Sequence, residues 1–259
     1  MTILVTNDDG IHASGLWALV GALKEIGEVV VVAPDREQSA IGTSVTLHHP
    51  LRATEIKPLV KGVKTYSVEG TPGDCVILGL GHLIKGEVDL VASGINEGAN
   101  LGDDVLISGT VAAAFQGHLN GIPSIAISVA AINDVNNDVA AKLATVLARK
   151  IQAYPVLKKT LLNINVPNLP LDQIQGIEVT QLGRRSYKDL IKEGHDGKRI
   201  YYWIVRGDAQ WQYDEGTDAS ALREGKISIT PLHADLTNTL PLDPLKDLSK
   251  AILEELITP

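Results

Sequence analysis

The sequence predicts an α/β protein: a Rossmann-like open sheet, mostly parallel, followed by a C-terminal extension rich in strands and a terminal helix. Over residues 1–155, apolar runs alternate with amphipathic segments of helical period, which is typical of a doubly wound sheet. Over residues 156–259, strand-like runs follow one another with little helix between them. We therefore predict a core at 1–155 that carries the functional site, and an extension at 156–259, made of strands, a hairpin and a helix, that completes the core and forms an oligomer interface.

The chain begins with a pattern of strand, helix and strand. Residues 2–6 form a short apolar run, and residues 15–27 place leucine and valine side chains at helical spacing. Residues 28–34, EVVVVAP, are a continuous β-branched run, as expected for a strand buried on both faces of a parallel sheet. Together these segments predict a βαβ unit.

The same alternation continues through the predicted core and then stops. Further core helices are predicted at residues 71–84, 109–119 and 138–154, and further core strands at 87–93 and 124–130. In the extension, strands are predicted at 161–167, 176–182, 199–207 and 226–232, and a last amphipathic helix at 244–256.

Composition and charge narrow the functional classes. Of 259 residues, 44% are hydrophobic and 21% charged, which is a globular composition. The net charge of −8 disfavours binding to nucleic-acid polymers or anionic membranes. Cys75 is the only cysteine, so an intrachain disulfide is excluded and a reducing compartment is favoured. With no signal-like segment and no apolar run of membrane-spanning length, we expect a cytoplasmic protein.

Three polar loops follow predicted parallel strands. Ligands bind at the carboxyl ends of such strands, where the topology switches, so these loops are the candidate site. The polar residues of the first loop are Asn7, Asp8 and Asp9; of the second, Asp35, Ser39, Thr43 and Ser44; of the third, Asn96, Asn100, Asp103, Asp104, Ser108 and Thr110.

The adjacent carboxylates Asp8 and Asp9 have two interpretations. Two neighbouring negative charges repel each other, and a divalent cation removes this difficulty. Carboxylate, hydroxyl and amide oxygens suit Mg²⁺, while the lack of paired cysteines or a His-x-x-x-His spacing disfavours zinc. Alternatively, the two aspartates turn the chain and cap the following helix. Their position after the first strand favours the metal interpretation.

Residues 108–110, SGT, stand where an alanine-rich helix is expected to begin. The free N–H groups and positive dipole end of a helix start can bind an anion, and a phosphate would suit this position. The alternative is that Ser108 or Thr110 is an ordinary N-cap residue.

Taken together, the motifs NDDG, SGIN and SGTV, with TDASALREGKISITPL late in the chain, resemble the survival protein SurE family of nucleotidases. The resemblance extends from residue 3 to about residue 237. It implies a phosphatase that uses one Mg²⁺ or Mn²⁺ per subunit to hydrolyse nucleoside 5′- and 3′-monophosphates. It also implies a homodimer or homotetramer whose subunits swap C-terminal elements.

The resemblance also implies roles for individual residues. The metal ligands it implies are Asp8, Asp9, Ser39 and Asn96, of which Asp8, Asp9 and Asn96 are also catalytic. The residues it places around the phosphate are Asn7, Gly42, Thr43, Ser108, Gly109 and Thr110. Ile107 stands where the family often has tyrosine, a difference that concerns substrate preference.

Two other functional classes remain open from the sequence. Another metal-dependent nucleotide-processing enzyme would bind a nucleoside diphosphate and release no phosphate from a monophosphate. A non-catalytic nucleotide-binding protein would bind the ligand without turnover. Within the phosphatase class, direct attack by water competes with an aspartyl-phosphate intermediate, which familiar sites build on Asp-x-Asp rather than on adjacent aspartates.

Overall fold

The computed structural model describes residues 1–186, 189–206, 210–237, 248–249, 252–253 and 256–257. Its strands are β1 (Thr2–Thr6), β2 (Glu28–Pro34), β3 (Ala53–Glu55), β4 (Lys64–Val68), β5 (Leu90–Glu97), β6 (Ser124–Val129), β7 (Leu161–Val166), β8 (Ile177–Val179), β9 (Arg184–Ser186), β10 (Asp189–His195), β11 (Ile200–Arg206), β12 (Gln210–Gln212) and β13 (Ile227–Leu232). The α-helices are α1 (Ser14–Leu23), α2 (Pro72–Leu78), α3 (Gly109–Leu119), α4 (Asp138–Ala153) and α5 (Asp218–Arg223). Short helices of other types are η1 (Gly79–Leu83), η2 (Gly102–Leu106), η3 (Pro155–Leu157) and η4 (Leu171–Gln173).

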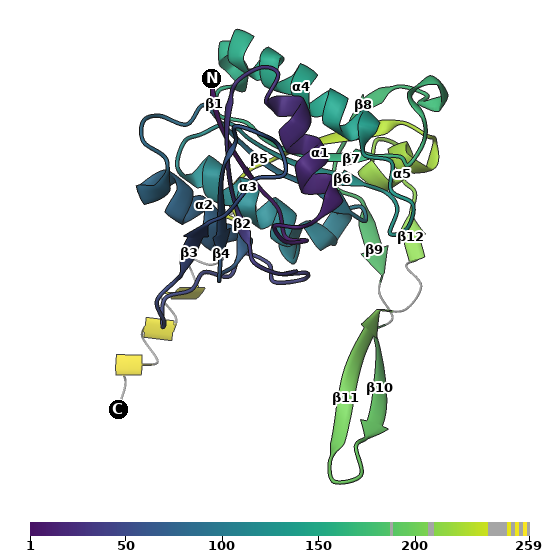
Figure 1. Ribbon diagram of the computed structural model, residues 1–259. Coiled ribbons are helices and arrows are strands. Elements are labelled where there is room, and N and C mark those ends of the chain that lie inside the picture. The colour runs from purple at the N-terminus through teal and green to yellow at the C-terminus, as the bar shows by residue number, and fades with distance from the viewer. Residues whose placement is uncertain (187–188, 207–209, 238–247, 250–251, 254–255, 258–259) are drawn as a thin grey trace.

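A nine-stranded sheet with the order β3-β4-β2-β1-β5-β6-β7-β13-β8 forms the centre of the molecule (Figure 1). The six strands from β4 to β7 in this order are mutually parallel. Antiparallel pairing occurs where β3 joins β4 and where β13 joins β7. The predicted fold class, an open and mostly parallel α/β sheet with a strand-rich C-terminal part, is therefore confirmed.

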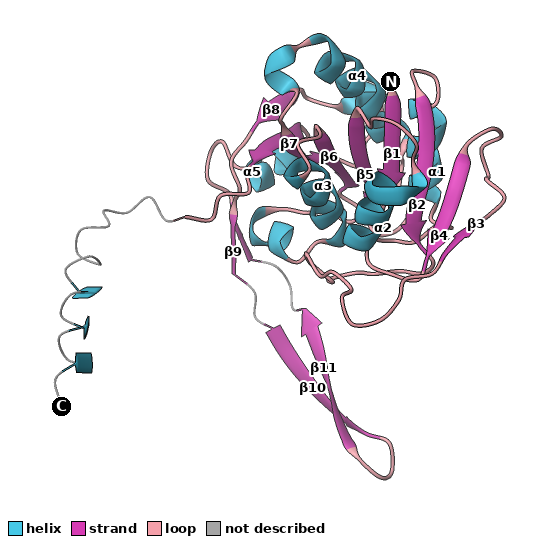
Figure 2. Cartoon of the chain, turned by 90° about the vertical axis from the view of Figure 1, so that its left-hand side faces the viewer, coloured by secondary structure: helices cyan, strands magenta, loops and turns pink. Residues whose placement is uncertain are grey.

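Helices cover both faces of the sheet (Figure 2). α1 packs beside α4 on one face, and α2 packs beside α3 on the other. The strands between these layers are almost entirely apolar; in β2, for example, Val30, Val31 and Val32 are buried. This two-sided burial explains why the parallel strands are continuous apolar runs in the sequence. None of the helices in the described residues is long and apolar enough to cross a bilayer.

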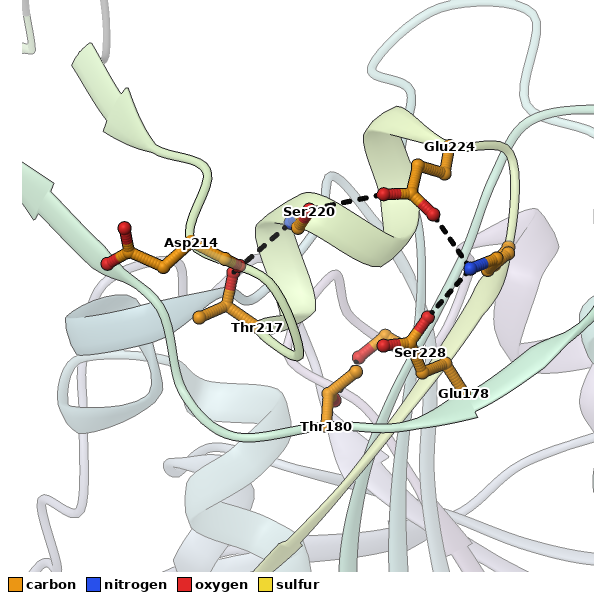
Figure 3. A network of polar contacts seen from close by, with 8 residues as sticks. Glu178, Thr180, Asp214, Thr217, Ser220, Glu224 and Ser228 are labelled. Carbon is orange, nitrogen blue, oxygen red and sulfur yellow. Dashed lines mark hydrogen bonds and ion pairs between the residues drawn. The ribbon is translucent and has the colours of Figure 1, made fainter.

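The C-terminal part adds strands to this sheet and a separate ribbon. β7, β8 and β13 extend the central sheet, and polar contacts around β13 include a hydrogen bond of 2.8 Å between the Thr180 and Ser228 hydroxyls (Figure 3). β10 and β11 pair antiparallel in a hairpin that projects from the body (Figure 1). The predicted helix at 244–256 lies largely outside the described residues.

Several elements differ from the sequence prediction. The predicted strand at 87–93 begins at Leu90 and continues to Glu97, so Asn96 lies at the end of a strand rather than in a loop. The predicted helix at 71–84 ends its α-helical part at Leu78 and continues as a π-helical turn. Elements that the sequence did not predict are short or exposed: β3, β4, β9, β10, β12 and α5.

Two glycines of α1 provide a matched test of packing against the sheet. A Cβ atom on Gly15 would overlap the backbone carbonyl oxygen of Ile95, whereas a Cβ on Gly21 would meet nothing within 4 Å. We expect Gly15→Ala to lower the free energy of unfolding by about 1–3 kcal/mol through overpacking. Gly21→Ala should raise it by about 0.5–1 kcal/mol, because alanine is the better helix former. Urea denaturation measures both, and equal effects would contradict the close approach of α1 to β5.

Candidate active site

The candidate site lies where the sheet changes direction. From β1, the chain adds β2 and then β4 on one side, and later β5, β6 and β7 on the other. The carboxyl ends of β1 and β5 are therefore adjacent, at the topological switch point. This topology brings residues 7–10, which follow β1, beside residues 96–100 at the end of β5.

Asp8 is buried at the centre of this edge. The residue is only 4% exposed, and its Oδ1 accepts a hydrogen bond from the Thr110 hydroxyl. A Cβ atom on Gly109 would lie 2.7 Å from the Asp8 Cβ and 3.0 Å from its Oδ2. Only glycine permits this close approach, so the first turn of α3 packs directly against the Asp8 carboxylate.

Asp9 follows Asp8 at the same edge of the sheet and contacts β5. Its Oδ2 accepts a hydrogen bond from the backbone N–H of Glu97 at 3.3 Å. Burial raises the pKa of Asp9 to about 7, and the neighbouring charge of Asp8 adds to this shift. Burial also raises the pKa of Asp8, although the hydrogen bond from Thr110 opposes it. Among the described residues, neither carboxylate forms an ion pair with a basic side chain.

The second polar loop is fastened to the other two by backbone hydrogen bonds. The N–H of Gln38 donates to the Asp8 carbonyl oxygen at 2.7 Å, and the N–H of Gly42 donates to the Ile107 carbonyl oxygen at 2.9 Å. Gly42 has a φ of +59°, a backbone conformation that favours glycine. The Ser39 hydroxyl donates to a carboxylate oxygen of Glu37 at 2.6 Å.

A pocket of about 320 Å³ lies between the three loops. The Asn96 side-chain nitrogen donates to the Gly98 carbonyl oxygen at 2.6 Å, which fixes the orientation of this amide at the pocket wall. The residues that line the pocket are Asp8, Ser39, Ala40, Asn96, Glu97, Gly98, Ala99, Asn100, Asp104, Ile107 and Ser108.

The structure brings most of the sequence-predicted residues together. Asp8, Ser39, Asn96 and Ser108 line one pocket, with Asp9, Gly109 and Thr110 in contact with its wall. Asn7 is buried and donates from its side chain to the Gly10 carbonyl oxygen at 2.9 Å, so it shapes the turn. Gly42 touches the pocket wall through Ile107. Thr43 is exposed and is not among the pocket-lining residues.

The sequence left a helix-capping role open at Asp8 and Asp9 and again at residues 108–110, and the structure gives a different answer at each place. α1 begins at Ser14 after Ala13, which makes no side-chain cap, so Asp8 and Asp9 do not cap this helix. Ser108, in contrast, is a true N-cap, because its Oγ accepts a hydrogen bond from the Val111 N–H at 3.1 Å. The same serine still lines the pocket, so capping and ligand contact are compatible at this position.

Part of the pocket wall, and the side chains that support it, were not predicted from the sequence. Glu97, Gly98, Ala99 and Ala40 line the pocket without belonging to a recognisable pattern. Asn163 and Asn165 lie in β7, are fully buried, and donate to the Asn100 carbonyl oxygen at 2.8 and 3.0 Å. Two asparagines at alternate positions in an otherwise apolar strand were the signal available in the sequence, because buried amides need partners.

The donor set fits a hard divalent cation. Two carboxylates, one hydroxyl and one amide oxygen are the ligands that Mg²⁺ or Mn²⁺ prefers. The described residues hold no cluster of three or more His, Cys, Asp or Glu side chains suited to a metal. Of the four predicted ligands, Asp8 and Asp9 carry a charge, and Ser39 and Asn96 would supply neutral oxygens.

The fold and the pocket define a class: doubly wound α/β proteins with an oxygen-rich pocket at the switch point, beside the start of a helix suited to an anion. The sequence pattern described as survival protein SurE matches residues 3–189. The chain belongs to the survival protein SurE family.

Relatives resemble the chain over nearly its whole length. A protein named 5′-nucleotidase SurE from Dehalococcoides mccartyi strain CBDB1 is 53% identical over 97% of this chain and 95% of its own. A protein of the same name from Geobacter metallireducens is 50% identical over 95% of this chain and 96% of its own. The crystal structure of the SurE protein from Aquifex aeolicus superposes with a TM-score of 0.82 at 41% identity, covering 96% of this chain and all of that one.

Proposed function

We propose that this chain is a phosphomonoesterase that hydrolyses nucleoside 5′-monophosphates, and 3′-monophosphates by the same chemistry, to nucleoside and phosphate. The observation that carries the proposal is the position of Asp8, which lines an open pocket and packs against the first turn of α3, with the Asp9 carboxylate bonded to Glu97 of the pocket wall. The names of the relatives, 5′-nucleotidase, support the substrate class.

We propose that one Mg²⁺ or Mn²⁺ is held by Asp8, Asp9, Ser39 and Asn96. Such a cation, when bound, neutralises phosphate charge and assists attack by water. The raised pKa of Asp9, together with the lack of an ion pair among the described residues, supports a binding site for positive charge here. Without a cation, two adjacent ionised carboxylates in a buried position repel each other.

The chain itself supplies binding and orientation. The backbone N–H of Gly109, at the start of α3, can donate to a phosphate oxygen whose charge changes during the reaction, while the Thr110 N–H donates to the Asp8 carboxylate beside it. Carboxylate oxygens of Asp8 and Asp9 can accept hydrogen bonds from the attacking water and orient it toward phosphorus. The Thr110 hydroxyl fixes the Asp8 side chain in this geometry.

Phosphate release tests the proposal. We expect purified protein to release inorganic phosphate from AMP, GMP, CMP and UMP when Mg²⁺ or Mn²⁺ is added. Excess EDTA should abolish release, and replenishing the metal should restore it, because the substrate is an anion that the acidic pocket alone repels. If folded, metal-supplemented protein releases no phosphate from any monophosphate while binding these nucleotides, the site is a binding site without turnover.

We propose that the protein is a cytoplasmic homodimer or homotetramer with swapped C-terminal elements. The single cysteine, Cys75, is buried and unpaired, in keeping with a reducing compartment. The β10–β11 hairpin exposes apolar side chains that a partner chain could cover. They include Ile191, Ile200, Tyr202, Trp203 and Ile204.

Light scattering tests the oligomer proposal. We expect the wild-type protein to have the mass of two or four chains, and a double variant, Trp203→Asp with Ile204→Asp, to have a lower mass, because buried charge without a partner opposes association. Val156→Asp is the matched control, since this exposed residue lies outside the hairpin. A monomeric wild type, or a double variant of unchanged mass, would contradict the role of the hairpin.

A further inference from the structure

Asp218, at the first position of α5, is a buried carboxylate that joins three segments of the chain. Asp218 as a whole is fully buried. Its Oδ2 accepts a hydrogen bond from the Gly102 N–H at 2.8 Å, and its Oδ1 accepts from the N–H groups of Gly183 and Ala219, also at 2.8 Å. Gly102 belongs to the third polar loop, 116 residues away in the sequence, and Gly183 directly precedes β9.

The hydrogen bond to Gly102 fixes the start of η2, the short helix that leads to the pocket. The carbonyl oxygen of Asp104 in η2 accepts hydrogen bonds from the N–H groups of Ile107 and Ser108, at 3.1 and 3.0 Å. Ser108 caps α3, whose next residues contact Asp8. The Ile107 carbonyl oxygen also holds Gly42 in the second loop. The position of η2 therefore determines where α3 begins and where Gly42 of the second loop lies.

The same loop has a second anchor immediately before Gly102. The Asn100 N–H donates to the Asn165 side chain at 2.8 Å, and the Asn100 amide donates to the Ser128 hydroxyl at 2.8 Å. These partners lie in β6 and β7, within the central sheet. With Asn100 fixed to the sheet, the direction in which the chain leaves toward η2 depends on the bond between Gly102 and Asp218.

We propose that Asp218 is a positioning residue for the phosphatase reaction: by holding Gly102, it sets η2 and the start of α3 at the distance from Asp8 that the reaction needs. This inference rests on the proposed function. Asp218 does not touch the pocket, and it acts only through backbone groups of the third loop.

Asp218→Asn separates this role from simple loss of volume. An asparagine keeps the size of the side chain but has only one acceptor oxygen, because its nitrogen donates. That oxygen can satisfy the two donors Gly183 and Ala219, which leaves the amide nitrogen facing the Gly102 N–H. The substitution therefore breaks the contact to the third loop and retains the contacts at the start of α5.

Thr217→Ala is the matched control. Thr217 precedes Asp218, caps α5 by accepting from the Ser220 N–H at 3.3 Å, and donates to the Asp214 carbonyl oxygen at 2.7 Å (Figure 3). Its side chain makes no hydrogen bond to the third loop. Thr217→Ala therefore weakens the start of α5 and leaves the third loop untouched, whereas Asp218→Asn removes the bond to Gly102.

Steady-state kinetics and amide hydrogen exchange test the proposal on the two full-length variants. With saturating Mn²⁺, we expect Asp218→Asn to lower kcat by at least about tenfold with a smaller change in KM, because small misplacement of groups around the reacting centre costs rate. Mass spectrometry should show faster exchange in peptides that cover residues 102–108. Thr217→Ala should change neither kcat nor the exchange rate of these peptides.

The outcomes separate this inference from the proposed function. Wild-type kcat retained in Asp218→Asn, or an equal loss in Thr217→Ala, would overturn the positioning role, as would unchanged exchange at 102–108. A wild-type protein without phosphatase activity would instead refute the proposed function, and the positioning role with it. In that case the exchange measurement would still show whether Asp218 holds the third loop.

Discussion

We expect Asp9→Asn to lower kcat/KM for nucleoside monophosphates by about 10³-fold or more, measured as phosphate release with saturating Mg²⁺ or Mn²⁺. The variant keeps the shape of the side chain but removes one of the two negative charges available to a cation. Loss of several kcal/mol of transition-state stabilisation corresponds to about this factor, at about 1.36 kcal/mol per tenfold. The amide oxygen of the new side chain can still accept the Glu97 N–H, so the fold should persist.

Asp172→Asn is the control for the loss of one negative charge. Asp172 lies in η4, is exposed, and does not line the pocket. We expect its activity to equal that of the wild type, because an exposed charge at a distance is screened by salt. Full activity in Asp9→Asn would show that the adjacent carboxylates do not carry the chemistry.

The same Asp9→Asn variant has a second expected effect, on the stability of the metal-free protein. The pKa of Asp9 rises from 3.8 to about 7 on folding. Between these two pH values the folded state binds more protons than the unfolded state, so the free energy of unfolding falls as the pH rises through this range. Asp9→Asn removes this penalty. We expect its melting temperature to exceed that of the wild type at about pH 8 and to match it near about pH 4. Lower stability of the variant at high pH would contradict the burial of an uncompensated charge.

The parallel core could be predicted from the sequence because burial on both faces leaves a strong pattern. β2 contains a run of four buried valines, Val29 to Val32, and the sequence alone predicts its bounds at 28–34. In the β10–β11 hairpin only β11 leaves a pattern, within the strand predicted at 199–207, and β10 was not predicted. The hairpin side chains Ile191 and Trp203 are exposed rather than packed on the body, and the polar strand β10 is ordered by its pairing with β11. The exposed strand β3 is only three residues long and was missed for the same reason.

The site residues that directly follow or end parallel strands could be predicted from the sequence, because the strand order of the sheet places them at one edge. Parallel strands end at a common edge, so the loops with Asp8 and Ser39 and the end of β5 with Asn96 are expected to meet, and the structure places all three at one pocket. The supports of the site could not be found in this way. Asp218 follows a threonine at a helix start, where an aspartate is an ordinary local choice, and only the three-dimensional fold reveals its bond to Gly102.

We expect Gly109→Ala to lower kcat by about 10²-fold, because a shift of about 1 Å at the reacting groups is sufficient for such a loss. The added methyl group would lie 2.7 Å from the Asp8 Cβ and 3.0 Å from its Oδ2, so the carboxylate or the start of α3 must move. Asp8 cannot give way easily, since its carboxylate accepts a hydrogen bond from the Thr110 hydroxyl and its backbone carbonyl oxygen accepts one from the Gln38 N–H. Phosphate release with saturating metal measures kcat, and isothermal titration of Mn²⁺ measures the effect on the cation.

Gly21→Ala is the control for adding a methyl group to a helical glycine, because a Cβ there meets nothing within 4 Å. It should retain wild-type kcat with a small gain in stability, since alanine favours the helix. The comparison therefore isolates the contact between α3 and Asp8 from the general effect of the substitution. If Gly109→Ala retained both wild-type kcat and Mn²⁺ affinity, the helix start would not need its close approach to the carboxylate, and the role of residues 108–110 in holding phosphate would have to be abandoned.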